Sequence, residues 1–313
     1  MHRQSLMQTR RDAETTDPSQ LHRELYAMNV RRLRPSSPAA PFDPAADVRW
    51  REAEERFLQA ERAAVADRAR AAPPDPAGFV AWFEELRAAG PGQHDELFDW
   101  LAASATREDM QWFLGQELAT EAGFDDLVAL TQRRMPTRAK LELANNYWDE
   151  MGRGRESAMH GPMLDALTEE LEVGGLRVEP CWESLALCNT LMGLAYNRRW
   201  AFHSIGALGA VELTAPDRCA KVKDGLARLR VSKLARRYYS LHEHIDEKHY
   251  AQWADEVLAP LVEEAPERAP WIAEGALMRL TAGARTFERY RAELWRPARA
   301  GVRAGADRLA VAS

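Results

Sequence analysis

Residues 217–259 read DRCAKVKDGLARLRVSKLARRYYSLHEHIDEKHYAQWADEVLA, a long stretch without a proline. Its apolar residues recur every three or four positions, which is the period of an α-helix with one buried face. At this length we expect two helices or one bent helix. Prolines separate further stretches of the same kind, and alternating Val/Ile/Thr runs are nearly absent, so the sequence predicts an all-α protein. The expected helices are 77–89, 93–104, 106–121, 123–134, 137–160, 163–172, 181–213, 217–259 and 270–295.

The N-terminal quarter has a different character. Eight of the 17 prolines lie before residue 77, which predicts punctuated and partly irregular structure. Residues 1 to about 46 lack periodicity and are typical of a tail or wrapping arm, whereas 48–71 favour one charged helix. We therefore expect an N-terminal tail and helical arm (1–76), one helical domain (77–296) and a C-terminal tail (297–313).

Composition narrows the classes of partner and compartment. Lys and Arg number 42 against 48 Asp and Glu, a net charge of −6, so nucleic acid is not an expected partner. An apolar run of about 18 residues is missing, which argues against membrane insertion, and the start lacks the apolar segment of a secretory signal. Cys181, Cys188 and Cys219 show no zinc-ligand spacing and are expected to be structural thiols of a cytoplasmic protein.

The densest group of ligand-type side chains is LHEHIDEKH, residues 241–249. On an α-helix, Asp246 lies about 40° from His242, and His249 about 20° from it on the other side. His244 points elsewhere and is left out. Any one of these histidines is more often part of a solvated helix face. Two imidazoles around a carboxylate on one face, however, form a ligand set suited to iron or manganese.

One helix cannot close a metal site, so further ligands must come from other helices. Glu212 ends the apolar run IGALGAVE, and Glu117 lies in the apolar segment WFLGQELA, where a lone buried carboxylate would be costly. Glu121, one turn further, competes with Glu117 for this role. Glu150 and His160 are the remaining candidates.

The ten-residue spacing of Glu150 and His160 does not fit one face of an ideal helix. Gly152 and Gly154 lie between them and would allow the helix to distort so that both reach one ion. Taken singly, each candidate also has an ordinary role: a surface acid for Glu117, a helix-face charge for Glu150, a helix cap for His160. Their coincidence on several helices favours a metal site.

The run 149–160, DEMGRGRESAMH, resembles the DExGxGxxxxxH segment of the haem-oxygenase-like di-iron oxidases and oxygenases, also called iron-containing redox enzymes. FLGQE at 113–117, ALGAVE at 207–212 and the His-x3-Asp-x2-His pattern of 242–249 are similar to the other ligand segments of that family, in the same order. The resemblance spans about residues 93–295 and implies a haem-oxygenase-like bundle of about seven core helices. It also implies that two irons are bound by the carboxylates and imidazoles of Glu117, Glu150, His160, Glu212, His242, Asp246 and His249.

The resemblance further implies an oxygenase or oxidase that activates O2 through a peroxide bridging the two irons, with a small-molecule substrate and an external reductant or reductase. The ten-residue spacing of Glu150 and His160 resembles the members that oxidise amine nitrogens, giving hydroxylamine or nitro products. Oxidative decarboxylation or C–C cleavage of a fatty acid or amino acid is the alternative, and a non-catalytic iron-binding protein is the second. A haem-degrading enzyme would not need seven ligands, and a thiaminase-like hydrolase would need a nucleophilic cysteine. A homodimer is compatible with the sequence.

Residues flanking the ligand segments are candidates for the substrate pocket, although aromatic residues at such spacing are more often core and arginines more often solvated. The aromatic candidates are Tyr147, Trp148, Trp200, Phe202, Tyr238 and Tyr239. The candidates for holding a substrate carboxylate are Arg198, Arg199, Arg236 and Arg237.

Overall fold

The computed structural model describes residues 17–41, 43–121, 123–173 and 179–295, and all regular structure within these ranges is helical. The all-α prediction is therefore confirmed. The first half contains α2 (Pro18–Leu33), α3 (Pro44–Ala69), α4 (Pro76–Ala89), α5 (Glu96–Ala103), α6 (Arg107–Glu121), α7 (Phe124–Thr131) and α8 (Thr137–Glu150). The second half contains α9 (His160–Glu170), α10 (Trp182–Tyr196), α11 (Ala201–Arg228), α12 (Arg237–Trp253), α13 (Ala259–Glu264) and α14 (Arg268–Leu294).

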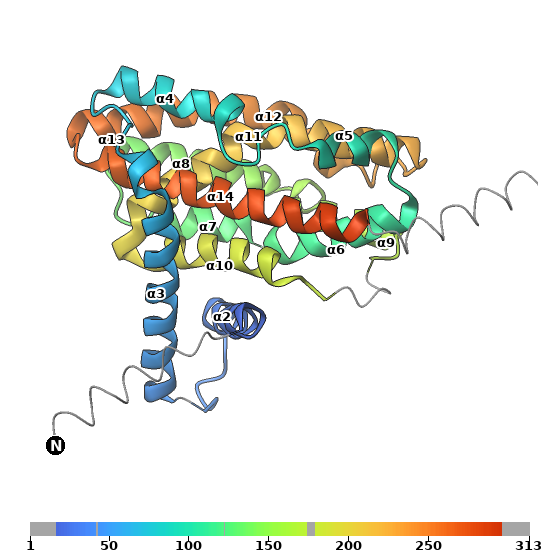
Figure 1. The fold of residues 1–313 in the computed structure, drawn as a ribbon, viewed down its shortest axis with the longest axis horizontal. Helices are drawn as coiled ribbons and strands as arrows, with labels where there is room; N and C mark the ends of the chain where they lie inside the picture. The colour runs from blue at the N-terminus through green and yellow to red at the C-terminus, as the bar shows by residue number, and fades with distance from the viewer. Residues whose placement is uncertain (1–16, 42, 122, 174–178, 296–313) are drawn as a thin grey trace, which may run out of the picture.

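α11 is the central helix of the bundle and packs along α14, α12 and α5 (Figure 1). Its contact with α14 is close because two glycines face the partner backbone. A Cβ on Gly206 would overlap the carbonyl of Ile272, and one on Gly275 would overlap the carbonyl of His203. Small residues at a crossing let two helix backbones approach more closely than larger side chains permit, which fixes where the side chains of α11 lie.

The boundaries of α11 differ from the expected ones. The sequence predicts helices at 181–213 and 217–259, separated by Pro216, but Pro216 lies inside a continuous α11. A proline removes one intrahelical hydrogen bond, here the bond to the carbonyl of Glu212, and the packing on both sides of α11 keeps the helix intact. The actual breaks fall at Asn197, whose side chain accepts a hydrogen bond from the Arg199 backbone N–H, and between α11 and α12.

The N-terminal arm is more regular than expected. Residues 18–33 were expected to be irregular but form α2, whose first turn is capped by the Asp17 side chain. Its buried residues His22, Leu25 and Met28 recur every three positions and pack against α10. The charged helix expected at 48–71 is α3, which crosses α14 and extends beyond the bundle (Figure 1).

The buried apolar residues form two clusters. The larger one joins α2 and α3 to α4, α10, α11 and α14, so the N-terminal arm shares a core with the bundle. The smaller one lies among α5, α6, α9, α11, α12 and α14 and surrounds the cavity described below. None of the described helices combines the length and the apolar character needed to cross a membrane. The three cysteines are free, with Cys188 and Cys219 buried.

Candidate metal centre

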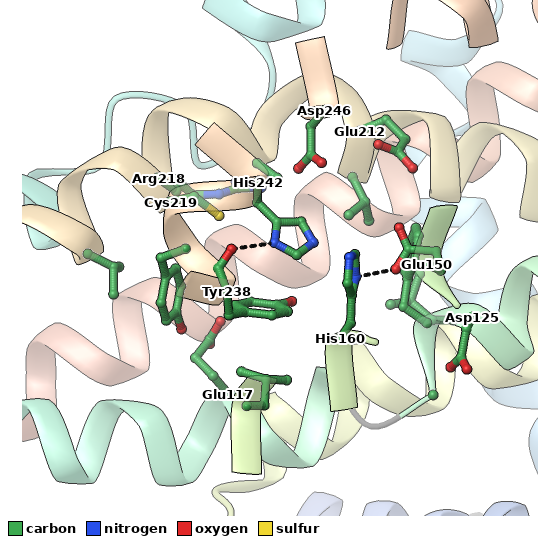
Figure 2. A pocket seen from close by; sticks show the side chains of 18 of the residues that line it. Glu117, Asp125, Glu150, His160, Glu212, Arg218, Cys219, Tyr238, His242 and Asp246 are labelled. Atoms are coloured by element: carbon green, nitrogen blue, oxygen red, sulfur yellow. Dashed lines mark hydrogen bonds and ion pairs between the residues drawn. The ribbon is translucent and has the colours of Figure 1, made fainter. Parts of the chain in front are cut away.

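α12 turns the predicted histidine and aspartate cluster toward the interior. The side chains of His242, Asp246 and His249 are all buried, with relative exposures of 8%, 3% and 1%. Their spacing of four and three residues puts them on the face of α12 that packs against α11, α8 and α9. The side chain of His244 lies outside the described residues. Figure 2 shows His242 and Asp246 pointing from α12 into the cavity.

Glu150 and His160 meet because the helix between them is interrupted. The expected helix 137–160 ends at Glu150, two short 3-10 turns follow, and α9 begins at His160. Gly152 and Gly154 both adopt positive φ, and a Cβ on Gly152 would lie 2.5 Å from the carbonyl carbon of Ala158, so this reversal requires glycine there. The result is a direct contact between His160 Nδ1 and Glu150 Oε2.

Five predicted residues form two overlapping groups of possible metal ligands. Glu150, His160 and His242 make the first group, and Glu150, Glu212 and His249 make the second. In each group one donor atom per residue lies within 4.8 Å of the others, so one cation could reach all three. Glu150 belongs to both groups. A carboxylate has two oxygens, so it can lie between two cations.

The chemistry of these donors fits two divalent cations. Glu150, Glu212 and Asp246 are each about 97% or more buried, and a cluster of carboxylates in such a place is costly unless cations offset it. Imidazole and carboxylate together suit iron and manganese. The residues present therefore fit the two irons that the resemblance implies.

Neighbouring groups orient three of the candidate ligands. His242 Nδ1–H donates to the Tyr238 carbonyl at 2.8 Å, which leaves Nε2 for the centre. His249 Nε2 lies 3.2 Å from Asp149 Oδ2, which leaves Nδ1 on the Glu212 side. The Asn146 side-chain amide donates to Glu212 Oε1 at 2.8 Å. Asp149 and Asn146 were not assigned roles from the sequence.

Burial and charge shift the histidine pKa values in opposite directions. Burial, reinforced by the nearby His160, lowers the pKa of His242 to about 3. Burial also lowers the pKa of His249, but hydrogen bonds to Glu212 and Asp149 and the charges of Glu212 and Glu150 outweigh burial and raise the pKa to about 9. His249 is thus protonated at neutral pH in the metal-free protein and must release that proton to bind a cation.

Glu117 lies in the wall of the same cavity but in neither group. Its Oε1 accepts a hydrogen bond from the Tyr290 hydroxyl at 3.1 Å. Tyr290 is fully buried, and burial together with the charge of Glu117 raises the pKa of its hydroxyl well above the usual value. The side chain of its competitor Glu121 lies outside the described residues, so the choice of first ligand stays a prediction.

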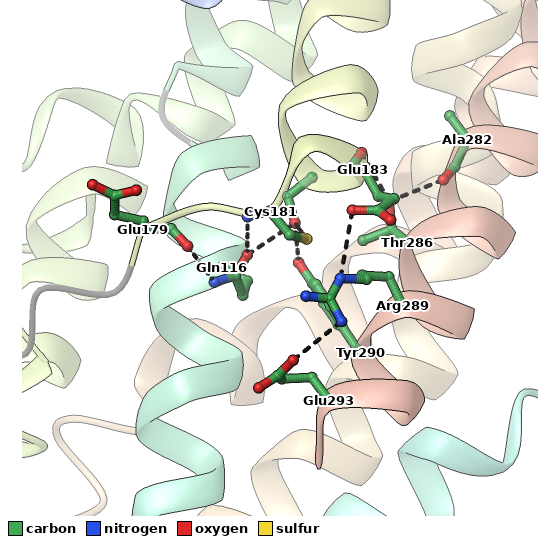
Figure 3. A network of polar contacts seen from close by, with 10 residues as sticks. Gln116, Glu179, Cys181, Glu183, Ala282, Thr286, Arg289, Tyr290 and Glu293 are labelled. Carbon is green, nitrogen blue, oxygen red and sulfur yellow. Dashed lines mark hydrogen bonds and ion pairs between the residues drawn. The ribbon is translucent and has the colours of Figure 1, made fainter. Parts of the chain in front are cut away.

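The Tyr290 hydroxyl continues into a polar network that joins α6, α10 and α14 (Figure 3). It lies 2.9 Å from Ser184 Oγ, which in turn hydrogen-bonds Gln116 Oε1 at 3.2 Å. The Cys181 backbone N–H also donates to Gln116 Oε1, at 2.8 Å. Burial raises the pKa of the Cys181 thiol, which agrees with its expected structural role. Through the Tyr290 hydroxyl, this network contacts the carboxylate of Glu117.

The cavity next to the candidate ligands has a volume of about 200 Å³. Of the expected aromatic walls, Tyr238 and Tyr239 line it, whereas Trp148 is half exposed at the surface and Trp200 is buried in the larger apolar cluster. Tyr147 and Phe202 pack against that same cluster. Phenylalanines from four other helices also line it, and local sequence gave no signal for them except for Phe113, which opens the FLGQE segment: Phe98, Phe113, Phe124 and Phe287.

The expected arginines bond elsewhere. Arg198 donates to backbone carbonyls in the last turn of α7 and just after it, and Arg199 pairs with Glu55. Arg236 and Arg237 donate to the backbone carbonyls of Val231 and Ser157. Among the described residues the arginines that line the cavity are instead Arg218 and Arg279.

A sequence model of the family described as "Iron-containing redox enzyme" matches residues 111–284, more than half of the chain. The chain belongs to this family. The matched region holds all seven predicted ligands, and it agrees with the resemblance stated above. No curated protein sequence matches the chain significantly.

Solved structures share the fold of this chain. Two crystal structures, at 2.00 and 1.35 Å resolution, are titled as a CADD-like protein of unknown function from Nostoc punctiforme. They are 18% and 17% identical to the chain, with TM-scores of 0.56 and 0.53. Each alignment covers 68% of this chain and 96% or 93% of the other. At this identity the likeness extends to the fold alone.

Proposed function

We propose that this protein is a non-haem di-iron oxygenase that activates O2 and oxidises a small metabolite. The observation that carries the proposal is the position of Glu150, whose carboxylate belongs to both groups of donor atoms. A shared carboxylate between two sets of ligands is the arrangement expected for a pair of cations rather than for a single one.

The proposed ligand set follows the two groups. Glu150, His160 and His242 would hold one iron, and Glu150, Glu212 and His249 the other, with Asp246 as a further carboxylate on the same face of α12. Glu117 or Glu121 stays the predicted seventh ligand. Two ferrous ions bound here would supply electrons for the reduction of O2, and an external reductant or reductase would return them.

Hydrogen bonds from neighbouring groups orient the proposed ligands. The Tyr238 carbonyl keeps His242 in the tautomer whose Nε2 can bind a metal, and Asp149 does the equivalent for His249 Nδ1. Asn146 holds one oxygen of Glu212 and leaves the other to the centre. The apolar walls of the cavity limit the access of bulk water to the reacting atoms.

For the substrate we propose an amine whose nitrogen is oxygenated. The ten-residue spacing of Glu150 and His160 supports this choice, since it resembles the nitrogen-oxidising relatives. An engineered cavity of about 150 Å³ holds benzene. The cavity here, of about 200 Å³, thus suits a molecule with one ring or a short chain.

The first test counts iron. The metal-free protein is loaded anaerobically with ferrous iron, and the wild type is compared with Glu150→Gln and with the control Glu243→Gln. Glu243 is next to His242 but pairs with Lys223. We expect about two irons per chain in the wild type and the control and less than one in Glu150→Gln. Absence of iron binding, or two irons in Glu150→Gln, would contradict the proposal.

The second test identifies the reaction. O2 is admitted to the loaded protein with a panel of amines and, separately, fatty acids, while the visible spectrum and the O2 consumption are recorded. Hydroxylamine or nitro products support N-oxygenation, whereas release of CO2 supports oxidative decarboxylation. Uptake of iron far beyond two per chain, without substrate oxidation, would instead identify an iron-binding protein.

A further inference from the structure

The cavity has a cationic group at a distance from the candidate ligands. Arg218 lies on α11, six residues after Glu212, which corresponds to about 9 Å along the helix axis. In Figure 2, Arg218 is on one side of His242 and Glu150 is on the other. The candidate metal centre, with its carboxylates, thus occupies one part of the cavity, and Arg218 occupies another.

Contacts from three sides hold the Arg218 guanidinium in place. Its Nη2 donates to Thr214 Oγ1 at 2.7 Å. Its Cζ lies 5.5 Å from the ring centre of Phe287 and 5.9 Å from that of Phe98, both of which line the cavity. A guanidinium that stacks on aromatic rings and is anchored at one nitrogen has lost much of its rotational freedom, so less entropy is lost when it binds an anion.

A second cavity of about 220 Å³ adjoins the first at this point. Arg218 and Phe98 line both cavities, so they stand in the wall between them. The wall of the second cavity contains the cations Arg87 and Lys221 besides Arg218, and the two acids Asp95 and Asp217. A substrate with an apolar body and one charged end could place the body in the first cavity and the charged end at Arg218.

We propose that Arg218 binds a carboxylate of the substrate and holds it away from the metal centre. The inference rests on the proposed function, because it assigns the orientation of the substrate in that site. The carboxylates around the centre repel a negative group, whereas the guanidinium offers a carboxylate two parallel donors. A phosphate group is commonly bound by backbone N–H groups at a helix N-terminus. The contacts of the Arg218 guanidinium are with side chains, so a carboxylate is the favoured ligand.

This orientation bears on the reaction. Figure 2 shows Arg218 and Glu150 on opposite sides of His242, so a carboxylate held at Arg218 is not the group that is oxidised. Oxidation then takes place at the opposite end of the substrate. The class of substrate is therefore a small acid that carries its reactive group, an amine in the proposed reaction, remote from the carboxylate.

The test measures binding to the iron-free full-length protein by calorimetry at pH 7. The probes are 4-phenylbutyrate and its neutral counterpart 4-phenylbutanamide, which have the same shape. We expect the wild type to prefer the acid by about 10- to 100-fold, since hydrogen bonds to a charged group have this effect on affinity. Arg218→Met should lose this preference, and Arg218→Lys should retain part of it.

Two further variants make the test specific. Arg279→Met removes the other arginine of the cavity, and Arg199→Met removes an exposed arginine paired with Glu55. Both should keep the preference for the acid. A preference that survives in Arg218→Met, one that is lost in Arg279→Met instead, or a wild type that binds neither probe would overturn the proposal. Circular dichroism establishes that each variant is folded.

The outcome is independent of the iron count, because no iron is present. If the protein binds no iron but loses acid preference in Arg218→Met, the carboxylate site stands and the oxygenase function falls. If iron binds as expected but the preference does not depend on Arg218, the substrate orientation falls and the oxygenase function stands.

Discussion

Removing the Asp149 carboxylate should weaken metal binding without a direct loss of a proposed ligand. Asp149 Oδ2 lies 3.2 Å from His249 Nε2, and both side chains are almost completely buried. A buried hydrogen bond to a charged group contributes about 1.5–3 kcal/mol. Asp149→Ala should therefore lower the affinity for a divalent metal by about 10- to 100-fold, the range found when a metal-binding histidine loses its carboxylate partner.

The matched control is Arg153→Met. Arg153 Nε contacts the other oxygen of Asp149 at 2.5 Å and its Nη2 donates to Oδ2 at 3.2 Å, but the Arg153 side chain is 62% exposed, so solvent screens its charge and we expect a smaller effect. The assay is titration of the metal-free protein with Co²⁺, followed by its visible absorption in competition with a chelator. Asp149→Asn keeps an acceptor oxygen for His249 and should recover part of the affinity. Wild-type affinity in Asp149→Ala, or an equal loss in Arg153→Met, would refute this role of Asp149.

Three more outcomes are expected. The raised pKa of His249 contributes about 3 kcal/mol to the free energy of unfolding of the metal-free protein. This contribution is fully present below pH 6.5 and is lost as the pH rises through 9. Chemical denaturation at pH 6.5 and 9.5 should show this loss in the wild type but not in His249→Gln. Gly206→Ala should destabilise the protein by about 1–3 kcal/mol through overlap with α14, whereas Gly161→Ala, with open space around it, should be neutral or slightly stabilising in the same thermal melts. Asn146→Ala leaves Glu212 without its amide donor and should lower Co²⁺ affinity, while the melting temperature changes by only a few degrees; unchanged affinity would exclude the positioning role.

Helix content could be predicted from the sequence, but helix boundaries only in part. The charged composition of 48–71 located α3, and the period of apolar residues located α4 and α6 closely. Treating each proline as a boundary failed at Pro216, because packing of α11 against α12 and α14 outweighs one lost hydrogen bond. The helix α2 was missed although His22, Leu25 and Met28 carry a helical period, since the surrounding Ser, Pro and Arg obscured it.

In the candidate site, too, some features could be predicted from the sequence and others depend on the tertiary structure. The positions of His242, Asp246 and His249 on one helix face follow from the α-helical repeat alone, so the sequence predicted them. That Glu150 reaches His160 depends on the reversal at Gly152, which the sequence made feasible but did not require. Asn146 and the cavity arginines have no local signature, and Asp149 opens the DExGxG segment but received no role from it.

The sequence by itself determined the helical class, the shared face of His242, Asp246 and His249 on α12 and the family pattern, because residue chemistry and the 3.6-residue period are local properties of the chain. The tertiary structure alone decided that Glu150 joins two groups of donors, that the Tyr290 hydroxyl donates to Glu117, and that Arg218 lies in the cavity wall. Those relations are set by how helices cross and how close their backbones come, as at Gly206 on α11, and such distances between remote segments depend on the packing of the whole bundle.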